Sequence, residues 1–116
     1  TMNVPEDGVL LRVFMGESDR EKGSDRPLYE AIVRKAREAH LAGATVLKGP
    51  IGFGKNSRVH STRLLELSTD LPIVIEIVDA EEKIAALLPF VDSLVKEGLV
   101  TIEAVRVLRY ASPDRR

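Results

Sequence analysis

A segment rich in glycine and in cationic side chains, residues 48–63, holds the residues of this sequence best suited to chemistry. It has no Asp or Glu and four Lys or Arg residues, so it contributes +4 to a formal net charge of −1 and leaves −5 for the rest of the chain. Glycines let backbone N–H groups converge on one point, and adjacent cations add positive charge. We therefore predict an anion-binding site made by these residues: Gly49, Gly52, Gly54, Lys55, Arg58, His60 and Arg63.

The same segment comes within one residue of the phosphate-binding pattern G-x-x-x-x-G-K-[ST], because Asn56 stands where Ser or Thr is required. No helix clearly follows it, no acidic strand end is placed to hold magnesium, and the chain is short for the sheet of such enzymes. The residues thus favour a general anion site over a nucleotide-hydrolysing loop. The alternative is a solvated loop whose glycines serve turns alone.

The other chemically active side chains do not form a catalytic set. His60 has no carboxylate at a spacing that would orient it, and two histidines without a third ligand make a poor metal site. Capping of the helix that follows explains Asp79, Glu81 and Glu82. We therefore expect that the protein is not an enzyme and that it holds neither a cofactor nor a resident metal. Because Phe53 is the only aromatic residue of the basic segment, nucleic-acid binding is not expected either.

The length and composition of the chain indicate one compact domain that could carry such a site. Its 116 residues fit one domain, and the core must be aliphatic because 44% of the residues are hydrophobic but only 4% aromatic. We expect a single domain over residues 1–116, frayed at 1–8 and 111–116. The lack of Cys fits a reducing compartment, and no apolar run approaches the roughly 18 residues that span a bilayer. A cytoplasmic location is therefore expected.

Hydrophobic periodicity predicts the order strand, helix, strand, long loop, strand, helix, strand. With right-handed crossovers, both helices cover one face of the sheet, which predicts an α+β, ferredoxin-like βαββαβ sandwich with a long loop between the second and third strands. The strands are expected at 9–15, 44–48, 73–78 and 99–110, and the helices at 27–42 and 81–95.

Local signals predict three irregularities in these elements. Gly43 is expected to cap the first helix, and Pro89 predicts a kink or a late start for the second. The apolar phase of the last strand shifts between Ile102 and Val105, which predicts a bulge or a bend.

The second face of the predicted sheet has nothing in this chain to cover it. Strands that are aliphatic on both faces need another cover, and a second copy of a short chain supplies one. We therefore predict a closed homo-oligomer, a homotrimer. Glu76 interrupts an apolar strand and needs a partner if it is buried at a subunit interface. Arg106 and Arg109 on the last strand are predicted either to pair with it or to contact the anion.

Five segments of the chain resemble the family called domain of unknown function 190. The most specific are G-x-x-G-F-G at 49–54 and D-L-P-[IV]-V-I-E at 70–76, and the others lie at 16–19, 27–33 and 43–46. That family is similar in fold to the nitrogen-regulatory PII signalling proteins, which are homotrimers of a ferredoxin-like unit. The resemblance implies the same oligomer that the uncovered sheet face predicts.

PII proteins bind adenine nucleotides in clefts between subunits, near the base of the loop between the second and third strands. By position, Gly49, Gly52, Gly54 and Lys55 would match that loop base, and Arg106 or Arg109 would match basic residues of the last strand. This chain departs from the PII pattern after its second helix, because only the sequence V-K-E-G-L stands where PII proteins have a glycine-rich phosphate loop.

The sequence therefore predicts a non-enzymatic, trimeric, PII-like signalling or regulatory protein. It would bind an anionic small molecule, such as a nucleotide, at inter-subunit clefts and act on a protein or membrane-protein target. Two alternatives stay open at this stage. One is a constitutive protein-interaction module without a ligand, and the other is a metal-binding trimer similar to the copper-tolerance relatives of PII.

Overall fold

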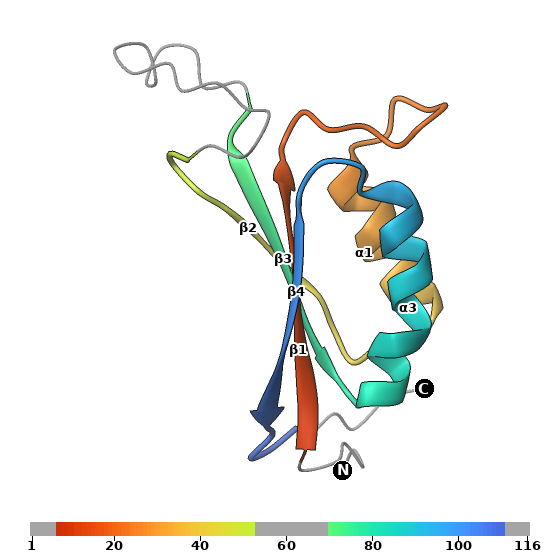
Figure 1. The fold of residues 1–116 in the computed structure, drawn as a ribbon, viewed down its shortest axis with the longest axis vertical. Helices are drawn as coiled ribbons and strands as arrows, with labels where there is room; N and C mark the ends of the chain where they lie inside the picture. Colours follow the sequence, from red (N-terminus) through yellow and green to blue (C-terminus); the bar gives the residue numbers. More distant parts are fainter. Residues whose placement is uncertain (1–6, 53–69, 111–116) are drawn as a thin grey trace.

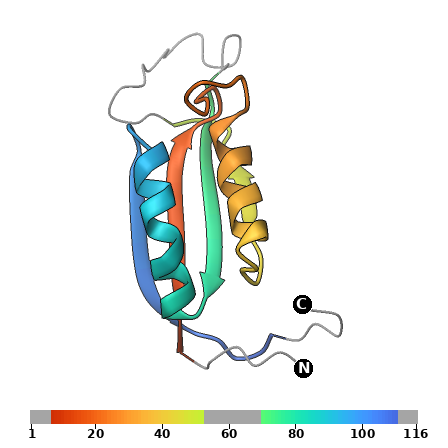
Figure 2. The same cartoon turned by 90° about the vertical axis from the view of Figure 1, so that its right-hand side faces the viewer.

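The computed structural model describes residues 7–52 and 70–110, which form a four-stranded antiparallel sheet covered by two helices. The strand order β2-β3-β1-β4 puts both crossover helices on one face, side by side (Figures 1 and 2). The predicted ferredoxin-like βαββαβ sandwich is confirmed. In chain order the elements are β1 (Asp7–Gly16), α1 (Leu28–Glu38), β2 (Thr45–Lys48), β3 (Pro72–Asp79), α3 (Glu81–Leu94) and β4 (Leu99–Arg106).

Alternation along the two central strands builds the core. β1 and β3 bury every second side chain beneath the helices, as the period of a strand requires. The helices contribute apolar positions three and four residues apart, which lie on one side of a helix. The fully or almost fully buried aliphatic side chains include Leu11, Val13, Ile75 and Ile77 from the sheet and Ile32, Ile84, Leu87 and Val91 from the helices.

The structure differs from the sequence-based expectation of a late start for the second helix, a bulge in the last strand and a Gly43 cap. The helix α3 begins at Glu81 and continues through Pro89, so its start is not delayed. β4 pairs with β1 in one unbroken register and ends at Arg106, so the expected bulge is absent from the described strand and residues 107–110 lie outside the sheet. α1 ends at Glu38, and His40 rather than Gly43 takes the left-handed conformation after it, with φ 63°.

The carboxylate of Asp79 has a tertiary role rather than the predicted role in capping α3. The helix begins after Ala80 without a side-chain cap. Asp79 is 4% exposed, and its two oxygens accept hydrogen bonds from the N–H of Ala80 at 2.6 Å and from the N–H of Ala42 at 2.7 Å. It thereby ties the end of β3 to the segment that leads into β2.

The chain between α3 and β4 passes close to β1 at Gly98, which leaves no room for a side chain. A Cβ atom built on it would collide with the backbone oxygen of Phe14, which cannot move without disturbing a central strand. Gly98→Ala is therefore expected to lower the free energy of unfolding by about 1–3 kcal/mol in chemical denaturation. Gly43→Ala is the matched control, because a Cβ there meets nothing within 4 Å. Equal stability of the two variants would contradict this account.

Candidate functional site

The base of the long loop is described as far as Gly52 and again from Asp70. Gly49 donates its N–H to the oxygen of Pro72 at 2.8 Å. Cβ atoms on Gly49 and Gly52 would lie 2.9 and 3.0 Å from Cγ of Pro72, so both glycines allow the chain to pass close to the proline ring. These two glycines therefore have a packing role at the loop base, and the N–H of Gly49 is already used by the protein.

The connector between β1 and α1 holds both ends of the loop. Glu17 Oε2 accepts a hydrogen bond from Lys48 Nζ at 2.9 Å, and this contact is the main cause that raises the pKa of the lysine. At the other end of the loop, the N–H of Glu17 donates a hydrogen bond to the backbone oxygen of Leu71 at 2.8 Å. The N–H of Ser18 donates one to Asp70 Oδ1 at 3.1 Å. One short acidic turn thus fixes where the loop leaves the sheet and where it returns.

The surroundings of Asp19 in this turn raise the pKa of its carboxyl group. Partial burial, and to a smaller extent the nearby Asp70 and Glu97, raise its pKa, although the N–H of Gly16 at 3.1 Å opposes the shift. The folded protein therefore holds this proton more tightly than the unfolded chain, so the contribution of Asp19 to stability falls as the pH rises from 3.8 through the raised pKa.

Asp19→Asn is accordingly expected to raise the melting temperature at pH 7, since the amide oxygen can still accept the Gly16 hydrogen bond. The difference from the parent protein should shrink toward pH 3, where the aspartic acid is protonated. Thermal unfolding followed by circular dichroism at the two pH values measures this. A variant that melts lower than the parent at pH 7 would refute the assignment.

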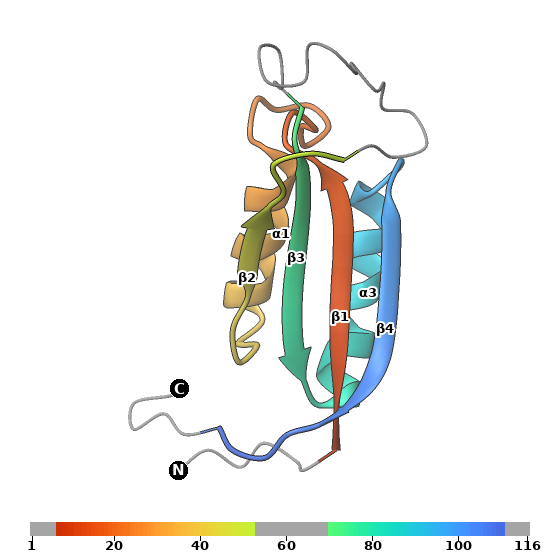
Figure 3. The same cartoon turned by 90° about the vertical axis from the view of Figure 1, so that its left-hand side faces the viewer.

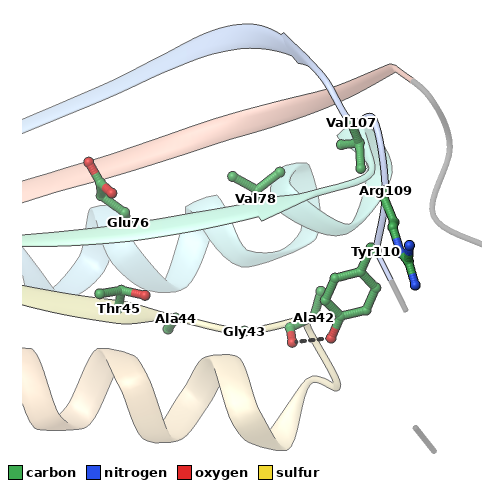
Figure 4. Close-up of a pocket in the computed structure, with 9 residues that line it drawn as sticks. All are labelled: Ala42, Gly43, Ala44, Thr45, Glu76, Val78, Val107, Arg109 and Tyr110. Atoms are coloured by element: carbon green, nitrogen blue, oxygen red, sulfur yellow. Dashed lines mark hydrogen bonds between the residues drawn. The ribbon is translucent and has the colours of Figure 1, made fainter. Parts of the chain in front are cut away.

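A cleft of about 460 Å³ lies at the opposite end of β2 from the loop base. Ligand pockets of proteins have volumes of about 300–1,000 Å³, so this cleft has the size of a small-molecule site. Its walls come from three parts of the chain: the approach to β2, the end of β3, and the segment after β4 (Figure 4). The lining residues are Ala42, Gly43, Ala44, Thr45, Glu76, Val78, Val107, Arg109 and Tyr110.

The segment after β4 crosses the end of the sheet (Figure 3). Its residues Val107, Arg109 and Tyr110 form one wall of the cleft. The hydroxyl of Tyr110 donates a hydrogen bond to the backbone oxygen of Ala42 at 2.8 Å. The N–H of Ala42 donates a hydrogen bond to the buried carboxylate of Asp79. Both polar groups of Ala42 are therefore bonded, which fixes the floor of the cleft. Glu76 lies at one end and Arg109, which is exposed, at the other (Figure 4). The cleft thus offers a carboxylate and a guanidinium to a ligand.

The sheet face away from the helices, here called the open face, is not covered by any helix or strand of residues 7–52 and 70–110 (Figure 3). Paired residues of neighbouring strands share a face, so the strand register assigns each side chain to one side. Leu47, Val78 and Leu99 on this face are 48%, 37% and 55% exposed. The apolar side chains that the register places there include Leu10, Phe14, Leu47, Val74, Val78, Leu99 and Val105.

A row of charged side chains crosses the middle of the open face on three adjacent strands. Arg12 Nε donates to Glu76 Oε2 at 3.0 Å, and one terminal nitrogen of the same guanidinium donates to Glu103 Oε1 at 3.0 Å. The hydrogen bond with Glu76 is the main cause that raises the pKa of Arg12. The expected partner for Glu76, Arg106 or Arg109, is therefore wrong: β1, which pairs with β3, supplies the arginine.

The structure divides the residues that the sequence assigned to one site. Gly49 and Gly52 lie at the loop end of the sheet, whereas Arg106 ends β4 at the other end and Arg109 lines the cleft beyond it. Gly54, Lys55, Arg58, His60 and Arg63 lie outside the described residues. The cleft wall at 42–45 was missed, because short residues before a strand carry no chemical signal in the sequence.

Neither a membrane-spanning helix nor a metal cluster is found in the described ranges. Within 7–52 and 70–110, no helix is both long enough and apolar enough to cross a bilayer. The same residues contain no group of three or more His, Asp or Glu side chains placed to hold a metal ion.

Solved structures with the same fold include PII-like proteins. One is CPII from Thiomonas intermedia, solved bound to ADP and bicarbonate. Its sequence is 20% identical to this chain, and the two structures have a TM-score of 0.61 over 89% of this chain and 90% of CPII. A candidate PII-like signalling protein from Thermus thermophilus is 15% identical, with a TM-score of 0.61 over 87% and 89% of the two chains. The chain therefore has a PII-like fold.

Relatives at higher identity cover most of the chain. A UPF0166 protein of Aquifex aeolicus is 37% identical over 99 residues, which are 85% of this chain and 91% of the relative. A UPF0166 protein of Methanocaldococcus jannaschii is 33% identical over 101 residues, which are 86% and 91% of the two chains. The family model of domain of unknown function 190, described as an uncharacterized ACR, matches residues 8–107. The chain belongs to this family, as the motifs of its sequence predicted.

Proposed function

We propose that this chain is a non-enzymatic, PII-like regulatory protein that forms a homotrimer through its open face and binds an anionic small molecule in the cleft that contains Arg109. The cleft is the observation that carries this proposal, because it combines the volume of a small-molecule site with a cationic side chain and a braced floor. The fold neighbour bound to ADP and bicarbonate supports an anionic ligand of nucleotide size.

Self-association is supported by the chemistry of the open face. Apolar side chains surround the row formed by Arg12, Glu76 and Glu103, and moving half-exposed aliphatic groups such as Leu47 and Leu99 out of water is favourable. Both helices lie on the other side of the sheet, so neither of them covers this face (Figure 1). A closed ring of three copies would cover the face on every subunit and leave none exposed.

A neighbouring copy would also reunite the predicted site. The loop base at Gly49 and the cleft at Thr45 lie at opposite ends of β2, which at about 3.3 Å per residue are roughly 10 Å apart. Arg109 of the same chain lies at the far end from the loop. In a homotrimer, a neighbouring subunit can bring its own Arg109 beside the loop base of the first, so that one ligand contacts both, which supports placing the site between chains.

Titration calorimetry with ADP, AMP, bicarbonate and phosphate, together with sedimentation equilibrium, tests the two halves of the proposal. We expect saturable binding of at least one nucleotide by a trimeric species, and weaker binding by Lys55→Ala. An absence of heat with every compound would overturn the ligand half, and a monomer at all concentrations would overturn the trimer. A target that is captured equally well with and without nucleotide would instead favour the constitutive interaction module.

A further inference from the structure

The row of charged side chains on the open face, here called the ion row, consists of Arg12, Glu76 and Glu103. It has two negative charges and one positive charge. We propose that this imbalance makes self-association of the protein depend on pH, and that Glu103 is the group whose charge opposes association. The inference rests on the proposed function, because it takes the open face as the surface on which the copies meet.

The geometry of the row is that of one cation between two anions. Arg12 stands on β1, with Glu76 on β3 and Glu103 on β4, and both contacts are 3.0 Å long. The side chains of Arg12 and Glu76 are 35% and 33% exposed, whereas that of Glu103 is 60% exposed. Glu103 is therefore the member that still has most of its water, and it loses the most when the face is covered.

No other charged side chain lies on the open face of the described strands. The register pairs Thr45 with Glu76 and Thr101 with Arg12, so the neighbours along the row are neutral. Lys48, Asp79 and Arg106 pair with Ile73, Val9 and Asp7, which alternate onto the helix side. Beyond the strands, Arg109 stands at the far end of the cleft from Glu76 (Figure 4). The row itself therefore has a net charge of −1.

Covering the face removes the water that screens this charge. A guanidinium paired with one carboxylate is neutral as a unit, but the second carboxylate then keeps a charge without a counterion, and taking such a charge out of water is unfavourable. Three copies around one axis would bring three excess charges toward each other, which adds repulsion. Arg12 stays charged, because the hydrogen bond with Glu76 raises its pKa.

Protonation relieves the imbalance. If association disfavours the charged form of a carboxylate, the associated state binds more protons than the separate chains, so association strengthens as the pH falls through the range of carboxylic acids, about 4–5. The same reasoning predicts that removing the charge of Glu103 strengthens association at neutral pH, although it also removes a salt bridge within the subunit.

Sedimentation equilibrium of Glu103→Gln at pH 7 and at about pH 4.5, which is within the range of carboxylic acids, tests the inference. The variant should associate about tenfold more tightly than the parent protein at pH 7 and should lose most of the pH dependence. Glu38→Gln is the matched control, since it removes an exposed carboxylate from α1 on the other side of the sheet and should behave as the parent does. Arg12→Gln should weaken association, because it leaves two carboxylates and no cation.

The outcomes separate this inference from the proposal beneath it. Association that is unchanged or weaker in Glu103→Gln, or equally pH-dependent in parent and variant, overturns the role of Glu103 while the homotrimer stands. Association of the variant but not of the parent supports the inference. A monomer in both cases overturns the homotrimer and this inference together.

Discussion

Leu99→Asp is expected to convert the protein into a folded monomer. Leu99 is 55% exposed in the single chain, so the aspartate stays in water and the free energy of unfolding changes little. In the proposed homotrimer the same position lies on the covered open face, where a new charge without a partner weakens association by about a hundredfold or more. Sedimentation equilibrium gives the mass, and circular dichroism shows whether the fold is kept.

Ile102→Asp is the matched control for this change. Ile102 stands on the same strand, is 56% exposed and pairs with Leu11, which places it on the helix side of the sheet. The two variants therefore introduce the same charge at the same exposure on opposite faces. If Ile102→Asp dissociates the protein and Leu99→Asp does not, the copies meet through the helix side of β4 and the open face is not the interface.

Arg109→Ala is expected to weaken the binding of ADP by about 10–100-fold in titration calorimetry. A charge-assisted hydrogen bond contributes roughly 1.5–3 kcal/mol, and a factor of ten in affinity corresponds to about 1.4 kcal/mol. Arg109 is exposed at the end of the cleft, so its removal takes away a ligand contact rather than a structural one.

Arg34→Ala provides the comparison, because it removes an exposed arginine from α1 on the helix side. Unchanged affinity in Arg109→Ala, alongside measurable binding by the parent protein, would place the anion site elsewhere. The monomer made by Leu99→Asp offers a further check, since a site built between subunits should lose affinity when the subunits separate, even though Arg109 is intact.

The sequence was most informative where structure depends on neighbours in the chain. A short apolar run at 9–15 and a β-branched run at 73–78 predicted the two central strands, and apolar positions three and four apart predicted both helices. It was less reliable where local rules met tertiary packing. Pro89 did not delay α3, because the helix already begins two turns earlier and is held by Ile84, Leu87 and Val91 against the sheet.

Long-range pairing decided the site. Glu76 was correctly predicted to need a partner, but the choice of Arg12 follows from the pairing of β1 with β3, which joins residues 64 apart in the chain. Likewise, nothing near Ala42 in the sequence indicates that Tyr110 binds its oxygen, since that contact depends on where the chain goes after β4 ends.

By itself, the sequence determined the elements, the α+β class, the family and the uncovered face, because these follow from periodicity, length and motif. Only the tertiary structure decided that the loop base and Arg109 stand at opposite ends of the sheet, that Arg12 neutralises one of two carboxylates, and that a cleft lies beside Arg109. The physical reason is register: strands distant in the chain are aligned by the packing of the whole core, and a one-residue change of that alignment would move every side chain to the other face.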